Sequence, residues 1–494
     1  MIGDLAAGAG LLVAAAAAAL VLVLEPSPRR SAALALALAL IPVLIVADQW
    51  NSAEISDLRD SPARFVFAAL LALALVAALS ELFRRRPLLV PLAIVAALPF
   101  RVPLEAGGES ANLLVPLYLV IAAGVVAAAV RDRGARGGLR KSLLPKALAV
   151  AIVAYALQAL YSEDFSMALR NTAFFYVPFA LAFSLLSDCR WDRRLLGATL
   201  ALAAAEALLF AAVGFWEYGA RELIWNDEVI RSNDFHTYFR VNSLFWDPNV
   251  YGRYLALVIT GLVGVMVWRR HPRAVLVLGA LAGVLWLAMV TTFSQSSFAA
   301  LLAGLAALAA LRWSLRWTLA ACGAVLVAAV VFVLAAGGSL KIDLSTEHKV
   351  NKDTAGRANL VTGGLELFGD RPLWGYGSGS FSKAFEEHQG KRRTTVSHTE
   401  PITVAAERGL IGLAVYIAVL AAAFATLLRG MVRETPGLRG PPEAAAEDAW
   451  RPLARAAVLA SFVALLVHTM AYAGFLDDPL TWVLLAIGGS LAAP

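Results

Sequence analysis

Long apolar runs alternate with short polar connections along the whole chain. About 15 of these runs, rich in Ala, Leu and Val, could cross roughly 30 Å of hydrocarbon as helices. An open sheet in lipid would leave its edge hydrogen bonds unsatisfied, so such runs predict helices rather than strands. The pattern predicts an all-α, polytopic integral membrane protein with about 12 to 15 transmembrane helices. The runs lie near residues 5–24, 31–47, 63–82, 87–102, 111–130, 143–160, 168–187, 195–218, 250–268, 274–292, 297–311, 317–336, 402–428, 453–473 and 479–493.

The short connections between these runs alternate in charge. One set is basic and includes RRR, DCRWDRR and RRHPR, whereas the other is acidic or neutral and includes YSEDFS and GFLDDP. Arg and Lys near the ends of membrane spans are retained on the cytoplasmic side. Every short connection fits one alternation, which predicts a cytoplasmic C-terminus and a cytoplasmic linker at 429–451.

Two longer polar segments fall on the outer side of this topology. Long connections in a compact protein are usually functional or disordered, and the Trp, Tyr, Phe and Arg in these two argue against disorder. We therefore expect the functional site there. The predicted organisation is helices at 1–218, an outer loop at 219–249, helices at 250–336, a large outer loop at 337–400 and helices at 401–494.

Composition agrees with a membrane protein. Of 494 residues, 60% are hydrophobic and only 16% are charged, and the mean hydropathy is +0.71. The net charge of +6 is spread over short loops, which favours topology signals and a bilayer partner over nucleic acid. Cys189 and Cys322 form neither a disulfide framework nor a metal-ligand pattern, so we expect no metal and no cofactor.

The first outer segment ends in the stretch RVNSLFWDPNVYGRYLAL. Arg240 precedes an Asp247-Pro248-Asn249 turn, and Asp and Asn beside Pro favour a turn and a helix cap. A lone arginine at this place could equally be an interfacial anchor with its stem along apolar surface. The role of Arg240 therefore depends on its neighbours.

The second outer segment contains an apolar pattern with helical spacing. Leu360, Val361, Leu365 and Phe368 predict a helix along the membrane interface, with Thr354 as a possible cap and Arg357 in its first turn. The stretch GDRPLWGYGSGSF follows. Its glycines predict a tight loop where the backbone approaches a ligand or another chain closely.

His398 stands where the second outer segment returns to apolar sequence. Either Ser397 and Glu400 form a capping box, or Thr399 is the cap with Pro401 in the first turn. Both alternatives place His398 at a helix N-terminus, where the partial positive charge disfavours imidazolium. A neutral imidazole can act as a general base. The alternative without a catalytic role is an interfacial histidine that only hydrogen-bonds to the loop.

The outer arginines give the histidine a chemical context. Guanidinium groups form bidentate, charge-assisted bonds to phosphate oxygens and so suit a diphosphate. A diphosphate leaving group bound by Arg, beside a His base, describes glycosyl transfer from a lipid-diphosphate sugar without a metal.

Four motifs in order make the chain resemble the O-antigen ligase and polymerase superfamily of bacterial envelope glycosyltransferases. They are RVNSLFWDPNVYGRYLAL, TTFSQSSFAALLAG, GRANLVTGGLELFGDRPLWGYGSGSF and SHTEPITVAAERGLIGLAVY, and together they cover roughly residues 240–416. Two positions depart from the family pattern. The Ser-rich turn often carries an Arg but here reads Ser294-Gln295-Ser296, and Asp247 replaces the more usual Asn before Pro248.

The resemblance implies a GT-C-like membrane enzyme that moves a glycan from undecaprenyl diphosphate to an acceptor sugar, with inversion at the anomeric centre. His398 would be the base, and Arg240 and Arg357 would bind the donor diphosphate. The active site would face the periplasm or the exterior from the cytoplasmic membrane. Further candidate binding residues are Arg392, Arg393, Asn249, Glu400 and Trp374; the two arginines could also simply attract lipid headgroups.

Several alternatives stay open. A ligase would glycosylate a surface acceptor such as lipid A-core, whereas a polymerase would extend a second lipid-linked glycan. A peptidoglycan-type polymerase of the shape-and-division family is more distant, and the histidine segment argues against it. A transporter or flippase would need ionisable groups deep in the spans, for which Glu206, Glu217 and His468 are the candidates.

Overall fold

The computed structural model describes most of the chain as helices. The described residues are 2–48, 61–106, 109–131, 138–235, 238–268, 271–335, 357–390, 397–431 and 450–493. Ten helices of this part are long and apolar enough to cross a membrane, and four further apolar helices are shorter. The predicted all-helical, polytopic fold is confirmed.

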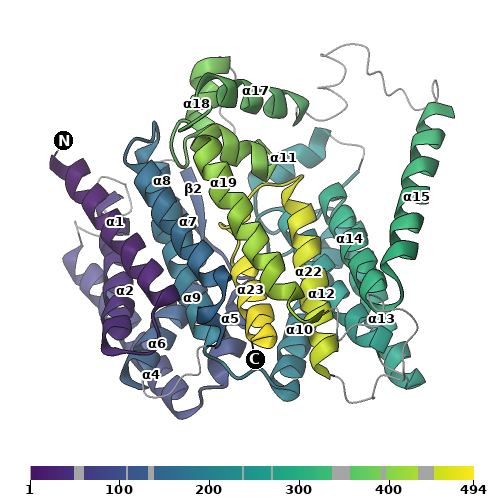
Figure 1. The fold of residues 1–494 in the computed structure, drawn as a ribbon, viewed down its shortest axis with the longest axis horizontal. Coiled ribbons are helices and arrows are strands. Elements are labelled where there is room, and N and C mark those ends of the chain that lie inside the picture. Colours follow the sequence, from purple (N-terminus) through teal and green to yellow (C-terminus); the bar gives the residue numbers. More distant parts are fainter. Residues whose placement is uncertain are drawn as a thin grey trace.

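The helices of the N-terminal half build one side of the bundle, except the last one, which packs against helices of the C-terminal half (Figure 1). They are α1 (Ile2–Val23), α2 (Pro28–Asp48), α4 (Pro62–Arg85), α5 (Leu89–Ala97), α6 (Val115–Arg131), α7 (Leu143–Ala159), α8 (Phe165–Arg170), α9 (Val177–Ser187) and α10 (Arg193–Ala220). A π-helical turn, η2 (Asn171–Tyr176), joins α8 to α9, and a 3-10 turn, η1 (Gly138–Lys141), precedes α7.

The helices of the C-terminal half complete the bundle. They are α11 (Asp227–Phe235), α12 (Pro248–Trp268), α13 (Pro272–Val290), α14 (Gln295–Arg312), α15 (Leu315–Ala335), α17 (Arg357–Asp370), α18 (Phe381–Gln389), α19 (Glu400–Leu428), α22 (Trp450–Thr469) and α23 (Pro479–Ala492). Helix α12 packs against α13, α14 and α22, and α19 packs against α7 and α23.

One predicted span is wrong. The run at 87–102 forms only the nine-residue helix α5, which at 1.5 Å per residue is too short to cross a bilayer. Pro99 has no backbone N–H with which to continue the helical hydrogen bonds, and the helix ends just before it. The chain continues as an antiparallel hairpin of β1 (Val102–Ala106) and β2 (Glu109–Leu113), with Val102 opposite Leu113.

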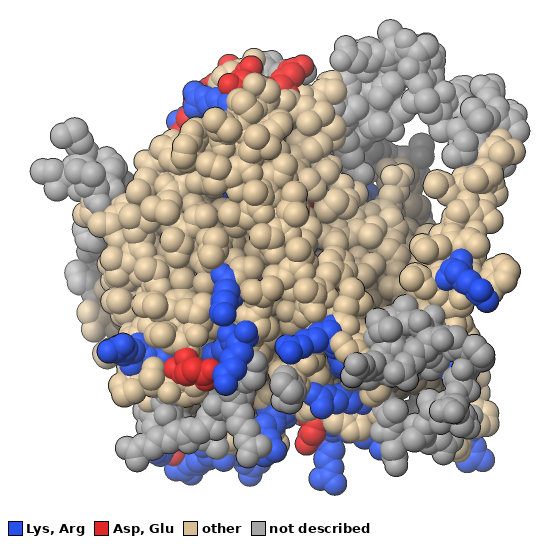
Figure 2. All heavy atoms as spheres, in the orientation of Figure 1, with Lys and Arg blue, Asp and Glu red and all other residues tan. Residues whose placement is uncertain are grey.

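The two ends of the bundle differ. Helices α17 and α18 lie across one end, here called the α17 end (Figure 1). At the opposite end, here called the basic end, Lys and Arg side chains gather below a broad band with few charges (Figure 2). The C-terminus lies at the basic end. The predicted cap Thr354 and most of the linker 429–451 lie outside the described residues.

Candidate functional site at the α17 end

His398 lies directly before α19, at the α17 end. Thr399 is the N-cap and Pro401 occupies the first turn, so the second capping alternative is confirmed. The capping box is not formed, because the Glu400 carboxylate instead accepts a 2.6 Å hydrogen bond from the Gly474 N–H. The hydroxyl groups of Ser397 and Thr403 lie 2.8 Å apart and tie the entering chain to the first turn of α19.

The backbone of His398 is strained. Its φ is +63°, in the left-handed region that residues with a side chain rarely adopt. Such conformations cost of order 1–3 kcal/mol and persist where surrounding structure enforces them. The imidazole is half-buried, and its centroid lies 6.1 Å from that of the Tyr472 ring. In this backbone conformation the His398 side chain points toward Tyr472, in the loop between α22 and α23.

Tyr472 links His398 to the turn that follows the first outer segment. Burial raises the pKa of Tyr472, and the Asp247 carboxylate, to which its hydroxyl is hydrogen-bonded, raises that pKa further. Asp247 also accepts hydrogen bonds from the N–H groups of Asn249, at 2.6 Å, and Val250, at 3.3 Å. The residue that departs from the family pattern thus caps α12 and holds Tyr472.

Arg240 is fixed between two of the motifs. The Asn233 side chain bonds to both its backbone N–H and its carbonyl, each at 2.9 Å. The guanidinium donates from Nε to the Thr292 carbonyl at 3.0 Å and from Nη2 to the Asn249 Oδ1 at 3.2 Å. Arg240 therefore bridges the Asp-Pro-Asn turn and the Ser-rich turn, and Asn249 orients it.

The Ser-rich turn precedes α14 and contacts a histidine of α22, a helix distant in the sequence. Ser294 is the N-cap, and its Oγ lies 2.8 Å from the Oγ of Ser297. Ser296 Oγ lies 3.1 Å from Nε2 of His468, whose ring centroid is 5.7 Å from that of Tyr472. Tyr472 thus lies beside both His398 and His468.

The two intramembrane glutamates have close polar partners. Glu206 accepts a hydrogen bond from the Tyr254 hydroxyl at 2.8 Å. Glu217 accepts from the N–H groups of Ser243, at 2.7 Å, and Ile224, at 3.3 Å, and so ties the first outer segment to the end of α10. These carboxylates hold neighbouring backbone and side chains in place.

The glycine-rich loop packs on the protein's own backbone. Gly375, Gly377 and Gly379 all have positive φ, and a Cβ on the first two would overlap with Glu407 and Ser162 respectively. The Glu407 carboxylate accepts hydrogen bonds from the N–H of Gly379, at 3.0 Å, and of Phe381, at 3.3 Å. The close approach is therefore to this protein's own backbone, at Glu407 of α19 and at Ser162.

Helix α19 changes course beside this loop. Gly409 has φ 60° and ψ −163° within the helix, and a Cβ there would overlap with Leu373. The preceding Arg408 is buried, lies 3.9 Å from the Tyr155 ring centroid and donates to the Tyr176 hydroxyl at 2.9 Å. Sequence reasoning missed this cluster, although a Glu-Arg pair inside an apolar run was its visible signal.

Three further ionisable groups were also missed. Arg253, on α12, pairs with Asp478, the N-cap of α23, at 2.6 Å, and both are buried. Half-buried Arg101 lies near them: burial lowers its pKa most, Asp478 raises it and Arg253 lowers it. An arginine soon after the Asp-Pro-Asn turn and the acidic pair in GFLDDP were the signals in the sequence.

The other predicted site residues are placed less directly. Trp374 is 60% exposed and its carbonyl accepts a 2.8 Å hydrogen bond from Tyr161. Arg357 is the first residue of α17, but its side chain lies outside the described part, as do Arg392 and Arg393 entirely. Among the described residues no group of three His, Cys, Asp or Glu is placed to hold a metal ion.

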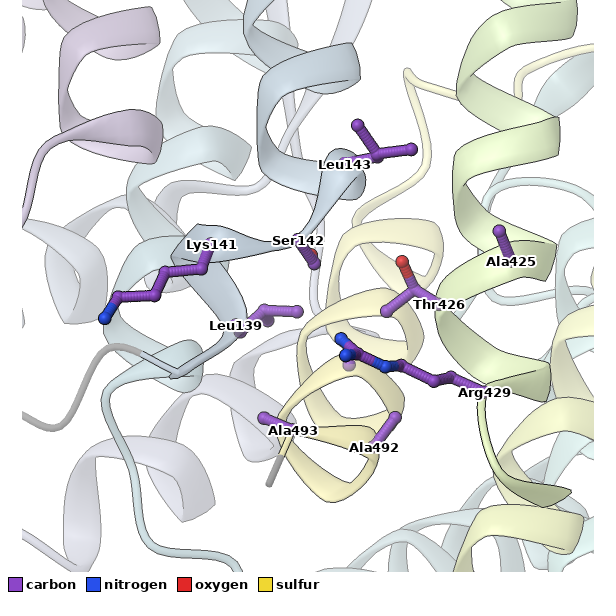
Figure 3. A pocket seen from close by; sticks show the side chains of 10 residues that line it. Leu139, Lys141, Ser142, Leu143, Ala425, Thr426, Arg429, Ala492 and Ala493 are labelled. Atoms are coloured by element: carbon purple, nitrogen blue, oxygen red, sulfur yellow. The ribbon is translucent and has the colours of Figure 1, made fainter. Parts of the chain in front are cut away.

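A cavity of about 260 Å³ lies at the basic end, far along α19 from His398 (Figure 3). The end of α19, the last turn of α23 and the start of α7 line it, and the Arg429 side chain reaches across it toward α23. This cavity contains none of the predicted site residues.

Comparison with known proteins supports the motif-based prediction. The family model described as O-antigen ligase matches residues 280–417, a segment that contains the Ser-rich turn, the glycine-rich loop and His398. Arg240 and Asn249 precede the matched segment. No curated protein matches the chain. The predicted resemblance to the O-antigen ligase superfamily is confirmed: the chain is a polytopic membrane protein whose residues 280–417 match the O-antigen ligase family model.

Proposed function

We propose that this protein transfers a glycan from undecaprenyl diphosphate to an acceptor sugar at the α17 end of the bundle. The family match supports a membrane glycosyltransferase of the O-antigen ligase or polymerase kind. The observation that carries the finer proposal is the placement of His398. Its strained backbone directs the ring to Tyr472, and Tyr472 and Asp247 connect it to the turn that orients Arg240.

The proposed chemistry needs a base and a bound leaving group. His398 takes the proton of an acceptor hydroxyl, whose oxygen attacks the anomeric carbon of the donor sugar from the face opposite the diphosphate. The bond from that carbon to the diphosphate oxygen breaks, and the diphosphate leaves with the electron pair. Because the attack comes from the face opposite the leaving group, the anomeric configuration inverts. Arg240 and Arg357 bind the negative charge of the diphosphate, so no metal is needed.

Other predicted residues have supporting roles in this proposal. Asn249 positions the guanidinium of Arg240, and Glu400 fixes the loop at Gly474 beneath His398. The exposed indole of Trp374 can stack on a sugar, and Arg392 and Arg393 add positive charge for the donor.

The orientation in the membrane follows from charge. The Lys and Arg side chains at the basic end favour the cytoplasmic face, which puts the α17 end and His398 in the periplasm or outside the cell. The C-terminus, at the basic end, would then be cytoplasmic, and the membrane would be the cytoplasmic one.

The test is glycan transfer by the purified full chain in lipid nanodiscs. Wild type and His398→Ala receive an undecaprenyl-diphosphate oligosaccharide and a mixture of lipid A-core and lipid-linked acceptors, with and without EDTA. We expect product from wild type alone, whether or not EDTA is present. Transfer to lipid A-core would identify a ligase, and a longer lipid-linked glycan a polymerase. Equal product from both proteins would exclude His398 as the base.

A further inference from the structure

Arg253 is buried with fewer partners than a guanidinium can take. Its side chain is 5% exposed and that of Asp478 is 4% exposed, and their ion pair measures 2.6 Å. The Arg253 Nε has no hydrogen-bond acceptor among the described residues. A guanidinium has five N–H donors, and a buried donor without an acceptor is unfavourable. The side chain therefore has donor capacity left for an anion.

The surroundings of Arg253 carry surplus positive charge. Arg101 and Arg253 act on each other and on the same carboxylate, that of Asp478. Asp247, the other carboxylate near Tyr472, already accepts from two backbone N–H groups and from Tyr472. A buried and a half-buried cation that share one carboxylate are unfavourable unless another negative group joins them.

This cluster is adjacent to the proposed diphosphate site. Asn249, which bonds to the Arg240 guanidinium, and Arg253 are four residues apart on α12, so their side chains lie on one face about 6 Å apart. The charges of Arg253 and Arg101 both act on Tyr472, the ring beside His398.

The cluster also adjoins the Ser-rich turn, which has no arginine of its own. A Cβ on Gly252, the residue before Arg253, would lie 2.5 Å from the Ser297 Oγ and 3.0 Å from the Thr292 Oγ1. The Thr292 carbonyl in turn accepts from Arg240. Both arginines thus lie at the junction of α12 with this turn.

We propose that Arg253 and Arg101 form a second phosphate-binding subsite, one helical turn deeper than Arg240. The subsite takes one phosphate of the donor diphosphate while Arg240 takes the other. Asp478 is the counter-ion that holds Arg253 when no donor is bound, and it yields Arg253 to the phosphate oxygens. This inference rests on the proposed function, because it assigns a place to the donor's second phosphate.

The test compares the binding of two short lipids, farnesyl diphosphate and farnesyl monophosphate, to the purified full chain in nanodiscs. Wild type should prefer the diphosphate, and Arg253→Gln should lower that preference at least tenfold. Arg253→Lys should recover part of it, because Lys retains the charge without the bidentate geometry. Unchanged preference in Arg253→Gln, or equal binding of both lipids by wild type, would overturn the subsite.

Two controls separate binding from folding. Arg30→Gln breaks another buried ion pair, with Asp188 at 2.7 Å, and should lower the Tm without changing the lipid preference. The exchange Arg253→Asp with Asp478→Arg keeps an ion pair, so its Tm should exceed that of Arg253→Gln while the preference stays low. Recovery of the full preference in the exchanged protein would overturn the assignment to Arg253.

The experiments can contradict the proposed subsite and the proposed function independently of each other. Binding uses no acceptor and no chemistry, so a protein that loses its diphosphate preference with Arg253→Gln but transfers no glycan would support the subsite alone. A protein that transfers glycan through His398 and keeps its preference in Arg253→Gln would support the enzyme alone.

Discussion

Two buried arginines in this protein have opposite surroundings. Arg408 lies over the Tyr155 ring, donates to the Tyr176 hydroxyl and pairs with Glu407 at 3.3 Å. Arg253 has one ion pair, and its Nε lacks an acceptor among the described residues. The two buried arginines therefore differ in how many of their N–H donors have an acceptor.

The difference extends to the backbone around each arginine. At Arg408 three segments meet with no room for a Cβ: the glycine-rich loop, the loop after α7 and the break in α19. At Arg253 the neighbouring polar groups are side chains of α12, α14 and α22 and of the loop between α22 and α23. The first region, here called the rigid region, packs tightly on Glu407 and Gly409 of α19, the helix that follows His398.

The largest expected effect is on the rigid region. In Gly377→Ala the new Cβ would overlap with the Ser162 backbone, at a position with φ of +97°. Neither backbone can move without breaking the loop's packing on α19, so little folded protein should be recovered. Size-exclusion chromatography after membrane extraction measures this. Gly369→Ala is the matched control, because nothing lies within 4 Å of its Cβ and yield should not change.

Arg408→Met should destabilise the fold without removing the chemistry. The change leaves the buried Glu407 carboxylate without its cation, which typically costs about 3–5 kcal/mol. The Tm should fall markedly, while the diphosphate preference of the folded fraction stays that of wild type. Adding Glu407→Gln should recover part of the Tm. A lost preference at unchanged Tm would contradict the structural role.

The sequence predicted the fold class because hydropathy and loop charge act over the whole chain. The sequence predicted a membrane span at 87–102 that is too long, because the hydropathy of a window does not take into account that Pro99 ends a helix. The helix that begins at Arg357 and the N-cap position of α19 were predicted correctly, because the spacing of apolar residues and the residue types at a helix start are local signals. Local sequence signals are therefore enough to predict secondary-structure elements, but not which elements pack against each other.

The parts of the site that were missed depend on contacts between distant segments. Arg253 and Asp478 are far apart in the chain, and neither residue alone distinguishes an ion pair from a topology signal. Tyr472 lies in a short loop with no motif, and only the fold brings it beside His398. The glycines predicted close approach, but their partner on α19 required the packed structure.

A moderate effect is expected when Arg240 is truncated. Arg240→Ala removes charge-assisted bonds to the donor worth on the order of 1.5–3 kcal/mol each, which corresponds to roughly ten- to hundredfold weaker donor use. Initial transfer rates against donor concentration measure it. Arg240→Lys should recover only part, because Lys lacks the planar fork. Full recovery by Lys would mean that simple charge attraction suffices.

The smallest expected effect is a pH dependence of stability from Asp477, which neighbours the Arg408 cluster. Burial, and next the nearby Glu400, raise the pKa of this half-buried carboxyl to about 7. A carboxyl with a raised pKa in the folded protein holds its proton more tightly there than in the unfolded chain. Its contribution to stability is therefore largest at low pH and declines as the pH rises toward about 7. Between pH 5 and 8 the Tm should fall more in wild type than in Asp477→Asn, whose amide cannot ionise. Thermal unfolding of both proteins at the two pH values measures the difference. Equal changes in Tm would show that Asp477 does not change its protonation between pH 5 and 8.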